Sequence, residues 1–505
     1  MKKPTPLPRA SHVNSGTSIP HEELPWPSRP GPVLRHHKIH LEHDARPDIT
    51  SLGGLALPLA LLRRLKAAQT LDANVDVFKR YLPYHESDHI ICQALMLYAG
   101  GSCLEDMAML QQDQALLKIL GAERTPDPTT SGDFLRRFVP RGKLESLRAG
   151  IDEVQETMWK NPKRWSWSRK RKRKPLAVLH LDGHLEQTSS TREGADFNYK
   201  GKWSYSVLVA SLADGECVGL RLRGGNVRSS DGAAELLDDV LPRLLKQFET
   251  VLVLADSDYD RADLRHACEG HGCYFAFVGR ETPDRPAIAE QPRVWRSFQT
   301  RAKRAAAERE AKPSFKRRKK KRNRRKRRAR QRGYKELKLA RQAVAETEGP
   351  GGTRIIIRRQ ILDVSKGKSP QREMWKEVRY RYVVTNLPSS WSAEDVIDET
   401  YKRCDQENIM AGLHTGIAAW RMPVAQLRGN AAWLEIARLA WNLGKWTAQL
   451  ALPKEVTRWE WKRFRRAFVD IPAQVIRTAR QLRVRVLGTH RYINEFLSAH
   501  ACLQV

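Results

Sequence analysis

Two aspartates that each follow a short apolar stretch are the first residues whose types and positions suggest chemistry. Residues 177–181 and 251–255 have the length and composition of buried strands, and Asp182 and Asp256 come directly after them. If the strands are neighbours, the two carboxylates meet, and carboxylate oxygens are the ligands that Mg²⁺ prefers. An aspartate after a strand also serves as a helix cap or a turn residue, so the pair alone leaves both interpretations open.

A third acidic residue, Glu407, lies on a helix predicted over residues 393–407, with or without a break. Arg403 precedes it by four residues, which places both side chains on one helical face, and Tyr401 is close by. Three carboxylates of this kind can hold two divalent metal ions that bind the attacking and leaving oxygens of a phosphodiester. Asp258 competes with Asp256 as the second carboxylate, and we prefer Asp256 because it directly follows the strand.

The elements that must position these residues are predicted by hydrophobic periodicity and turn signals. Before residue 138 the pattern is helical, and residues 177–278 alternate between short strands and helices. Strands are expected at 203–212, 217–222, 274–278, 353–362 and 377–385, and helices at 232–245, 261–268, 427–450 and 472–482. The Asp214-Gly215 dipeptide predicts a hairpin. The whole is an α/β protein in which a mostly β segment interrupts the strand and helix alternation.

The expected domain organisation follows from these changes of pattern. The regions are a disordered leader at 1–50, a helical domain at 51–150, the first part of an α/β core at 175–280, a β-rich insertion with a basic run at 281–385, the second part of the core at 386–450 and a helical C-terminal region at 451–505.

Charge indicates the class of partner. The chain has 505 residues with 90 Lys and Arg against 57 Asp and Glu, a net charge of +33. Much of the excess lies in two runs, residues 169–174 and 316–332, which should bind a polyanion, and nucleic acid is the first candidate. No apolar stretch approaches the roughly 18 residues that span a bilayer. With no secretory signal and seven irregularly spaced cysteines, we expect a cytoplasmic protein without membrane contact.

One short segment offers an alternative metal site. His266, Cys268, His271 and Cys273 lie within eight residues, but they lack the paired C-x-x-C spacing of zinc sites. We interpret them as residues at a helix end and in the core.

Several motifs in the same order resemble a known family. They are residues 197–203 (FNYKGKW), 255–257 (ADS), 384–387 (VTNL) and 405–408 (DQEN), together with Tyr401, Arg403 and Glu407. They resemble the DDE transposases of bacterial insertion sequences, in the cut-and-paste group with a Tyr-Arg-Glu-Lys signature. The resemblance covers about residues 51–487. It implies a ribonuclease H-like mixed sheet flanked by helices, with Asp182, Asp256 and Glu407 as the catalytic, metal-binding triad.

The resemblance also implies an activity and its partners. The protein would be a Mg²⁺-dependent endonuclease and strand transferase with two metal ions, for which Mn²⁺ is a substitute. It would cut double-stranded DNA at the terminal inverted repeats of the element, pass through a hairpin intermediate as members of this group usually do, and join the freed 3′-OH to target DNA. A homodimer on DNA and an association with the bacterial nucleoid follow from that reaction.

Further residues are expected to contact DNA. The signature implies this role for Tyr401, Arg403 and His414, although Tyr401 precedes Arg403 by two residues instead of three, and His414 stands where the family has lysine. Lys200 and Lys202 belong to the motif at 197–203. An unstacked base needs an aromatic platform, which Trp295 or Trp375 could provide.

Two other functions compete with an active transposase. The altered Tyr401 and His414 positions suit a catalytically inactive or domesticated DNA-binding derivative. A basic RNA-binding protein would fit the charge but would leave the three ordered carboxylates unexplained.

Overall fold

The computed structural model describes residues 48–504, apart from 81–82, 162–175, 281, 284, 293, 299–327, 332–333, 365–375, 479–480 and 489. Residues 47–505 form one compact unit. The expected leader and the basic run at 169–174 lie outside the described residues, except that residues 48–50 are described. The second basic run is described only at residues 328–331. Within the described ranges no helix has both the length and the apolar content needed to cross a bilayer.

Helices make up most of the described residues between 53 and 159. The α-helices are α1 (Ala56–Arg64), α2 (Ala67–Asn74), α3 (Glu86–Tyr98), α4 (Ala108–Gln111), α5 (Gln114–Leu120), α6 (Pro128–Arg136) and α7 (Lys143–Trp159). The Asp127 side chain caps α6, since it accepts a hydrogen bond from the Thr130 backbone N–H. The strand β1 (Ile49–Thr50) precedes these helices.

A large mixed sheet follows. Its described strands are β2 (Ala177–Gln187), β3 (Asp196–Phe197), β4 (Trp203–Leu212), β5 (Cys217–Gly224), β6 (Val251–Ala255), β7 (Tyr274–Val278), β8 (Arg296–Ser297), β9 (Arg328–Gln331), β10 (Tyr334–Glu348), β11 (Arg354–Val364) and β12 (Lys376–Thr385). Their order is β3-β4-β2-β6-β7-β12-β11-β10-β8, with β5 on β4 and β9 on β10. The pairs β2–β6 and β6–β7 are parallel, and the others are antiparallel. The β-rich insertion therefore continues the sheet through β7 and β12.

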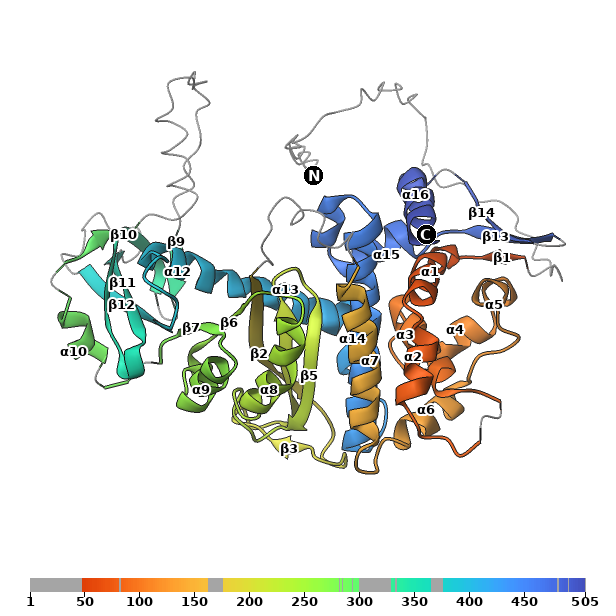
Figure 1. The fold of residues 1–505 in the computed structure, drawn as a ribbon, viewed down its shortest axis with the longest axis horizontal. Coiled ribbons are helices and arrows are strands. Elements are labelled where there is room, and N and C mark those ends of the chain that lie inside the picture. The colour runs from red at the N-terminus through yellow and green to blue at the C-terminus, as the bar shows by residue number, and fades with distance from the viewer. Residues whose placement is uncertain are drawn as a thin grey trace, which may run out of the picture. The chain divides into compact units, whose positions relative to one another are not determined.

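Helices cover both faces of the sheet (Figure 1). One face packs on α8 (Ala233–Leu245) and α9 (Ala262–Gly270) through a shared apolar cluster. The opposite face packs on α12 (Ala393–Thr400), while α13 (Gln406–Ala411) and α14 (Leu427–Ala451) cover β4 and β5. The α/β class expected from the sequence is confirmed.

Helix α14 joins the helical region to the sheet. It is buried along most of its length and contacts α3, α7 and β5. Buried ion pairs link it to α7: Arg438 pairs with Glu435 at 2.8 Å and with Asp152 of α7 at 2.8 Å, and Glu435 also pairs with Arg148 at 3.0 Å. Charges buried this completely persist only where partners surround them.

A buried carboxylate on the β4–β5 turn completes this network. Oε1 of Glu216 accepts hydrogen bonds from Gln155 Nε2 at 2.7 Å, Trp159 Nε1 at 2.9 Å and Trp446 Nε1 at 2.9 Å. We refer to the ion pairs and hydrogen bonds of Glu216, Glu435 and Arg438 as the interior network. It ties β5, α7 and α14 together.

The C-terminal region differs from the prediction. After α15 (Trp461–Phe468), residues 472–482 were expected to be helical, but they form β13 (Ala473–Thr478) and the start of β14 (Gln481–Val486), which pair as an antiparallel hairpin with β1 at its edge. The reason is period-two alternation: Leu482, Val484 and Val486 alternate with arginines, which suits a strand and not a helix. The chain then continues into α16 (Ile493–Gln504).

Candidate active site

The parallel pairing of β2 with β6 places the two aspartates at the same level of the sheet. The register joins Ala177 to Val251 and His180 to Leu254, a constant offset of 74 residues. Asp182 and Asp256 are also 74 residues apart, so they continue this register on adjacent strand positions. Neighbouring strands lie about 4.8 Å apart. The backbone therefore brings the two carboxylates side by side.

Alternation along the strands assigns both aspartates to the same face. Leu179 and Leu181 point into the cluster with α8 and α9, and Leu254 points into the cluster with α12. Even-numbered residues of both strands therefore share the face on the α12 side, and these include Asp182 and Asp256. The prediction was wrong in one detail, because β2 does not end at residue 181 but continues through Asp182 to Gln187.

Local backbone groups hold each carboxylate. Oδ1 of Asp182 accepts a hydrogen bond from the Gly183 N–H at 2.8 Å. Oδ1 of Asp256 accepts one from the Asp258 N–H at 3.0 Å and so caps the turn that follows β6. Asp256 thus combines the cap role with its position beside Asp182. The side chain of Asp258 is exposed.

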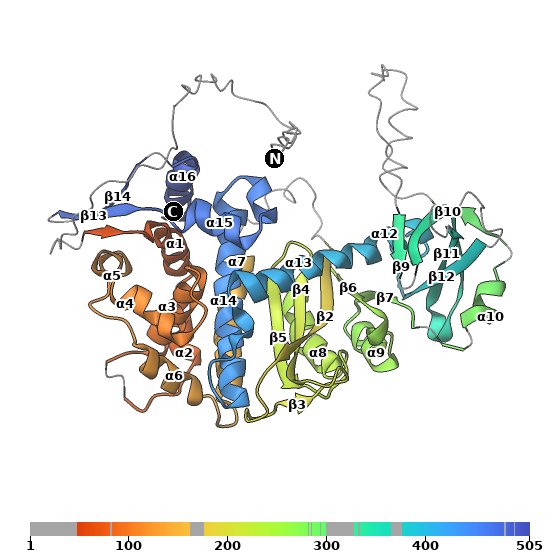
Figure 2. The same ribbon diagram turned by 180° about the vertical axis from the view of Figure 1, so that it is seen from behind.

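The third carboxylate arrives on a separate helix. The predicted helix 393–407 is broken: α12 ends at Thr400, residues 401–405 form a 3₁₀ turn, and α13 begins at Gln406. The buried Gln406 side chain donates hydrogen bonds to the backbone oxygens of His180 at 3.4 Å and Val209 at 3.2 Å. Figure 2 shows α12 and α13 crossing β2 and β4. Gln406 therefore anchors Glu407 against the strand that carries Asp182.

A glycine fixes the other end of α13. A Cβ atom built on Gly412 would lie 2.3 Å from the ring of Trp441 on α14, so any larger residue would push the segment away from α14. Gly412 and Gln406 thus hold the segment from both ends.

The pKa of Asp182 is raised, and the causes of this shift identify charged groups near it. Burial is the largest cause that raises its pKa, the negative charges of Asp256 and Glu407 raise it further, and Arg403 acts in the opposite direction. Asp256, Glu407 and Arg403 therefore lie near enough to Asp182 for their charges to affect its pKa.

Tyr259 adjoins the same carboxylates from the turn after β6. It is fully buried, and burial together with Asp182 and Asp256 raises its pKa well above the usual value, so the phenol stays protonated. Its hydroxyl donates to the backbone oxygen of Ser229 at 3.1 Å. The side chain thus holds the loop before α8 against the site. No sequence pattern predicted this role for Tyr259.

The site has the oxygen donors that a divalent cation needs. Asp182, Asp256 and Glu407 supply carboxylates alone, a set that suits Mg²⁺ or Mn²⁺ better than softer metals. Within the described residues no three His, Cys, Asp or Glu side chains are already gathered tightly enough to hold a metal ion. Glu407 is exposed, so it would have to move toward the aspartates to share a cation with them.

Beyond Asp182, alternate residues of β2 bring two more polar groups to the same face. The ring of His184 lies 5.8 Å from that of His414 and stacks on Trp420 at 5.3 Å, and its Nε2 lies 3.0 Å from Glu186 Oε2. His414, predicted as a DNA contact, therefore lies beside His184, which is two residues after Asp182 on β2. Sequence reasoning missed His184 and Glu186, although period-two spacing from Asp182 could have found them.

Other predicted DNA contacts lie further out. Tyr401 is partly exposed, and the Arg358 guanidinium of β11 lies 5.1 Å from its ring centroid. Lys200 and Lys202 are exposed on the turn before β4, beyond the Gln187 end of β2. The structure thus places Tyr401 beside the β-rich segment and separates the two lysines from the carboxylates.

The proposed aromatic platforms have different outcomes. Trp295 lies with its ring centroid 4.2 Å from the Arg359 guanidinium and 6.2 Å from the Tyr380 ring, so its ring is already packed. Trp375 lies outside the described residues. The segment from His266 to Cys273 ends α9, and there His271 Nε2 lies 2.9 Å from Asp238 Oδ1.

Comparison with known proteins identifies the class. The family model described as the transposase DDE domain, group 1, matches residues 32–505. The chain therefore belongs to the DDE transposases, and within them to group 1. Among curated proteins no relative matches the sequence.

Among solved structures, the chain is similar to the piggyBac transposase in a cryo-EM structure of its synaptic complex with hairpin DNA. The identity is 10% and the TM-score is 0.36, over 83% of this chain and 79% of the piggyBac chain.

Proposed function

We propose that this protein is a DNA transposase that cleaves and joins DNA at the ends of an insertion sequence, with Asp182, Asp256 and Glu407 as its catalytic triad. Family membership supports the class of reaction. The observation that supports the assignment is the parallel register of β2 and β6, by which Asp182 and Asp256 are neighbours, together with the hydrogen bonds that dock Gln406, next to Glu407, on β2 and β4.

The proposed division of work follows from the positions of the residues. Asp182 and Asp256, on adjacent parallel strands, would form the rigid part of the site, and Glu407 would close it from α13. Two Mg²⁺ ions held there would activate a water molecule and stabilise charge on the phosphodiester oxygens. Arg403, whose positive charge lowers the pKa of Asp182, would contact a phosphate of bound DNA.

The residues around the triad would keep it in place. Gln406 fixes the start of α13 on β2 and β4, and Tyr259 keeps the loop before α8 against the site. His414 would contact the DNA near the cleaved end in place of the lysine of related transposases. The ribonuclease H-like core and the helical DNA-binding domain at 51–150 belong to the same proposal.

The test is cleavage of a plasmid that carries the ends of the element. The purified protein with Mg²⁺ should nick the plasmid at those ends, and Asp256→Asn or Glu407→Gln should abolish nicking while DNA binding persists. If either variant nicks at the wild-type rate, the triad is wrong. If the wild type binds the ends but never cuts them, with Mg²⁺ or Mn²⁺, the protein is the inactive DNA-binding derivative.

A further inference from the structure

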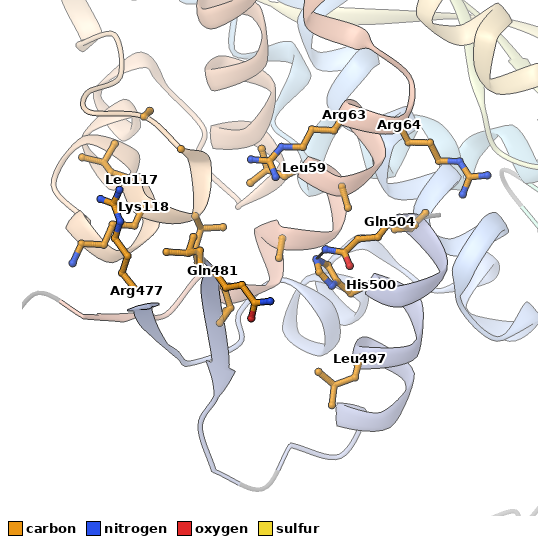
Figure 3. Close-up of a pocket in the computed structure, with 18 of the residues that line it drawn as sticks. Leu59, Arg63, Arg64, Leu117, Lys118, Arg477, Gln481, Leu497, His500 and Gln504 are labelled. Atoms are coloured by element: carbon orange, nitrogen blue, oxygen red, sulfur yellow. Dashed lines mark hydrogen bonds between the residues drawn. The ribbon is translucent and has the colours of Figure 1, made fainter. Parts of the chain in front are cut away.

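A second surface, remote in sequence from the triad, also carries positive charge. A cavity of about 1120 Å³ opens between α1, α5, α16 and the β13–β14 hairpin. We call it the basic cleft. Its basic lining residues are Arg63, Arg64, Lys118 and Arg477, and Glu123 is the acidic residue among its described lining. Figure 3 shows Arg63 of α1, Lys118 of α5 and Arg477 of the hairpin, with Arg64 extending from α1 in the direction opposite to Arg63.

Among the described residues, only Lys118 of these four cations forms an ion pair with a carboxylate. Lys118 pairs with Asp48 at 3.0 Å, and Arg64 donates to the backbone oxygen of Cys502 at 3.1 Å. Neither Arg63 nor Arg477 forms an ion pair with a described carboxylate. Burial and the positive charge of Arg63 lower the pKa of His500, which also lines the cleft. The cleft therefore has a positive potential that an anionic ligand would neutralise.

The hairpin has one packed face and one free face. Val475 and Val484 are paired and lie against the helical region, whereas Arg483 and Arg485 stand on the opposite, exposed face. Toward its tip the packed face continues as Arg477 opposite Leu482, which is 41% exposed. Both faces of the tip thus carry arginine. A two-stranded ribbon fits the major groove of B-form DNA, which is about 12 Å wide.

We propose that the basic cleft and the β13–β14 hairpin bind the phosphate backbone of duplex DNA, independently of its sequence. This inference rests on the proposed transposase function, which supplies DNA as the ligand. Arg63 and Arg477 contact phosphates from opposite walls of the cleft, and Arg483 and Arg485 extend the contact along the outer face of the hairpin. The surface holds the duplex without contributing to the cleavage chemistry.

The experiment measures binding of a short fluorescent duplex of arbitrary sequence by anisotropy over a range of salt concentrations. The double variant R63Q/R477Q of the full chain should bind about tenfold more weakly, and its slope of log affinity against log salt should fall by about 1.8, since each lost phosphate contact removes about 0.9. Arg466→Gln, which changes an exposed arginine of α15 outside the cleft, is the control and should leave both values near wild type.

Further variants separate this inference from the proposed function. R483Q/R485Q changes only exposed side chains and should weaken binding in the same way, so a folding defect in the first variant would not hide the result. Asp182→Asn should bind like wild type. If wild type binds and cuts DNA but both double variants bind it equally well, the cleft is not the surface. Stronger binding of duplex RNA than of DNA would also overturn the inference. If wild type binds no DNA, the proposed function fails first.

Discussion

Two groups of carboxylates in this molecule are treated in opposite ways. In the interior network, Glu216 accepts three side-chain hydrogen bonds, and Glu435 has two arginine partners. Burial alone would raise the pKa of Glu435, but Arg438, Arg148 and Arg221 outweigh it and the pKa is lowered. At the candidate site the pKa of Asp182 is raised instead.

The difference distinguishes carboxylates that stabilise the fold from carboxylates that we propose bind a metal ion. The interior network supplies its own counter-charges. Removing one partner therefore leaves a buried charge without full compensation, which destabilises the folded state. At the site Asp182, Asp256 and Glu407 add their negative charges, and Arg403 offsets them only in part. Repulsion between like charges is common at functional sites, and it lowers the stability of the folded protein.

The largest expected effect comes from Asp182→Asn. It should reduce DNA nicking about a thousandfold or more, because several kcal/mol of charge stabilisation are lost, while the midpoint of thermal unfolding stays the same or rises as repulsion is relieved. Nicking assays and thermal unfolding measure the two effects. The matched control is Asp258→Asn, two residues from Asp256, which should nick normally. If Asp182→Asn and Asp258→Asn lost nicking activity equally, the loss would not be specific to the proposed triad.

The opposite behaviour is expected for Glu435→Gln. Removing this buried charge takes one carboxylate partner from Arg438, which keeps Asp152, and another from Arg148, and it should lower the free energy of unfolding by about 3 kcal/mol. Denaturant titration measures this loss, and the nicking rate of the protein that remains folded at low temperature should be close to wild type. Glu145→Gln, on the exposed side of α7, should change stability little. An unchanged midpoint in Glu435→Gln would show that the network does not stabilise the fold.

Divalent cations should act on one region only. At a concentration 100 times its dissociation constant, Mn²⁺ should stabilise the folded protein by about 2.7 kcal/mol, because it binds the folded carboxylates. Thermal unfolding with and without Mn²⁺ should show this gain in wild type and in Glu435→Gln, but not in Asp182→Asn. A gain that survives in Asp182→Asn would place the cation elsewhere.

The smallest effect is a pH dependence of opposite sign in the two regions. The lowered pKa of Glu435 gives stability that is present above its usual value of 4.5 and is lost as pH falls through the folded value. The raised pKa of Asp182 makes its ionisation costly, so stability falls as pH rises above 3.8. Denaturant titrations at several pH values should therefore show the loss in Glu435→Gln and the gain in Asp182→Asn both shrinking toward acid pH. A constant difference would contradict the assigned pKa directions.

The parts of the fold that the sequence predicted are those set by local pattern. The strands at 203–212 and 251–255 and the helix at 232–245 follow from apolar runs and period, and they agree with β4, β6 and α8 within a residue. The alignment of Asp182 with Asp256 could also be anticipated, because both follow the apolar segments of strands that become parallel neighbours. The hairpin of β13 and β14 was missed: residues 472–482 were predicted to be helical, and the alternation that indicates a strand, Leu482, Val484 and Val486 with arginines between them, lies mostly after that range.

Long-range contacts account for what could not be predicted. The break at residues 401–405 depends on α13 docking through Gln406 onto strands about 200 residues earlier. Tyr259 reaches the site only once β6 and the loop before α8 are in place. The interior network joins α7, the β4–β5 turn and α14, which no local pattern connects. Each of these depends on tertiary packing, and no single segment carries a signal of it.

The most direct measurement of the central claim is where a divalent ion binds in the folded protein. Crystals grown with Mn²⁺ and measured at its absorption edge should give anomalous density between the carboxylates of Asp182 and Asp256, with Glu407 turned toward it, and the same density should be missing in Asp182→Asn. Anomalous density confined to other residues, or the same density in the Asn variant, would contradict the account.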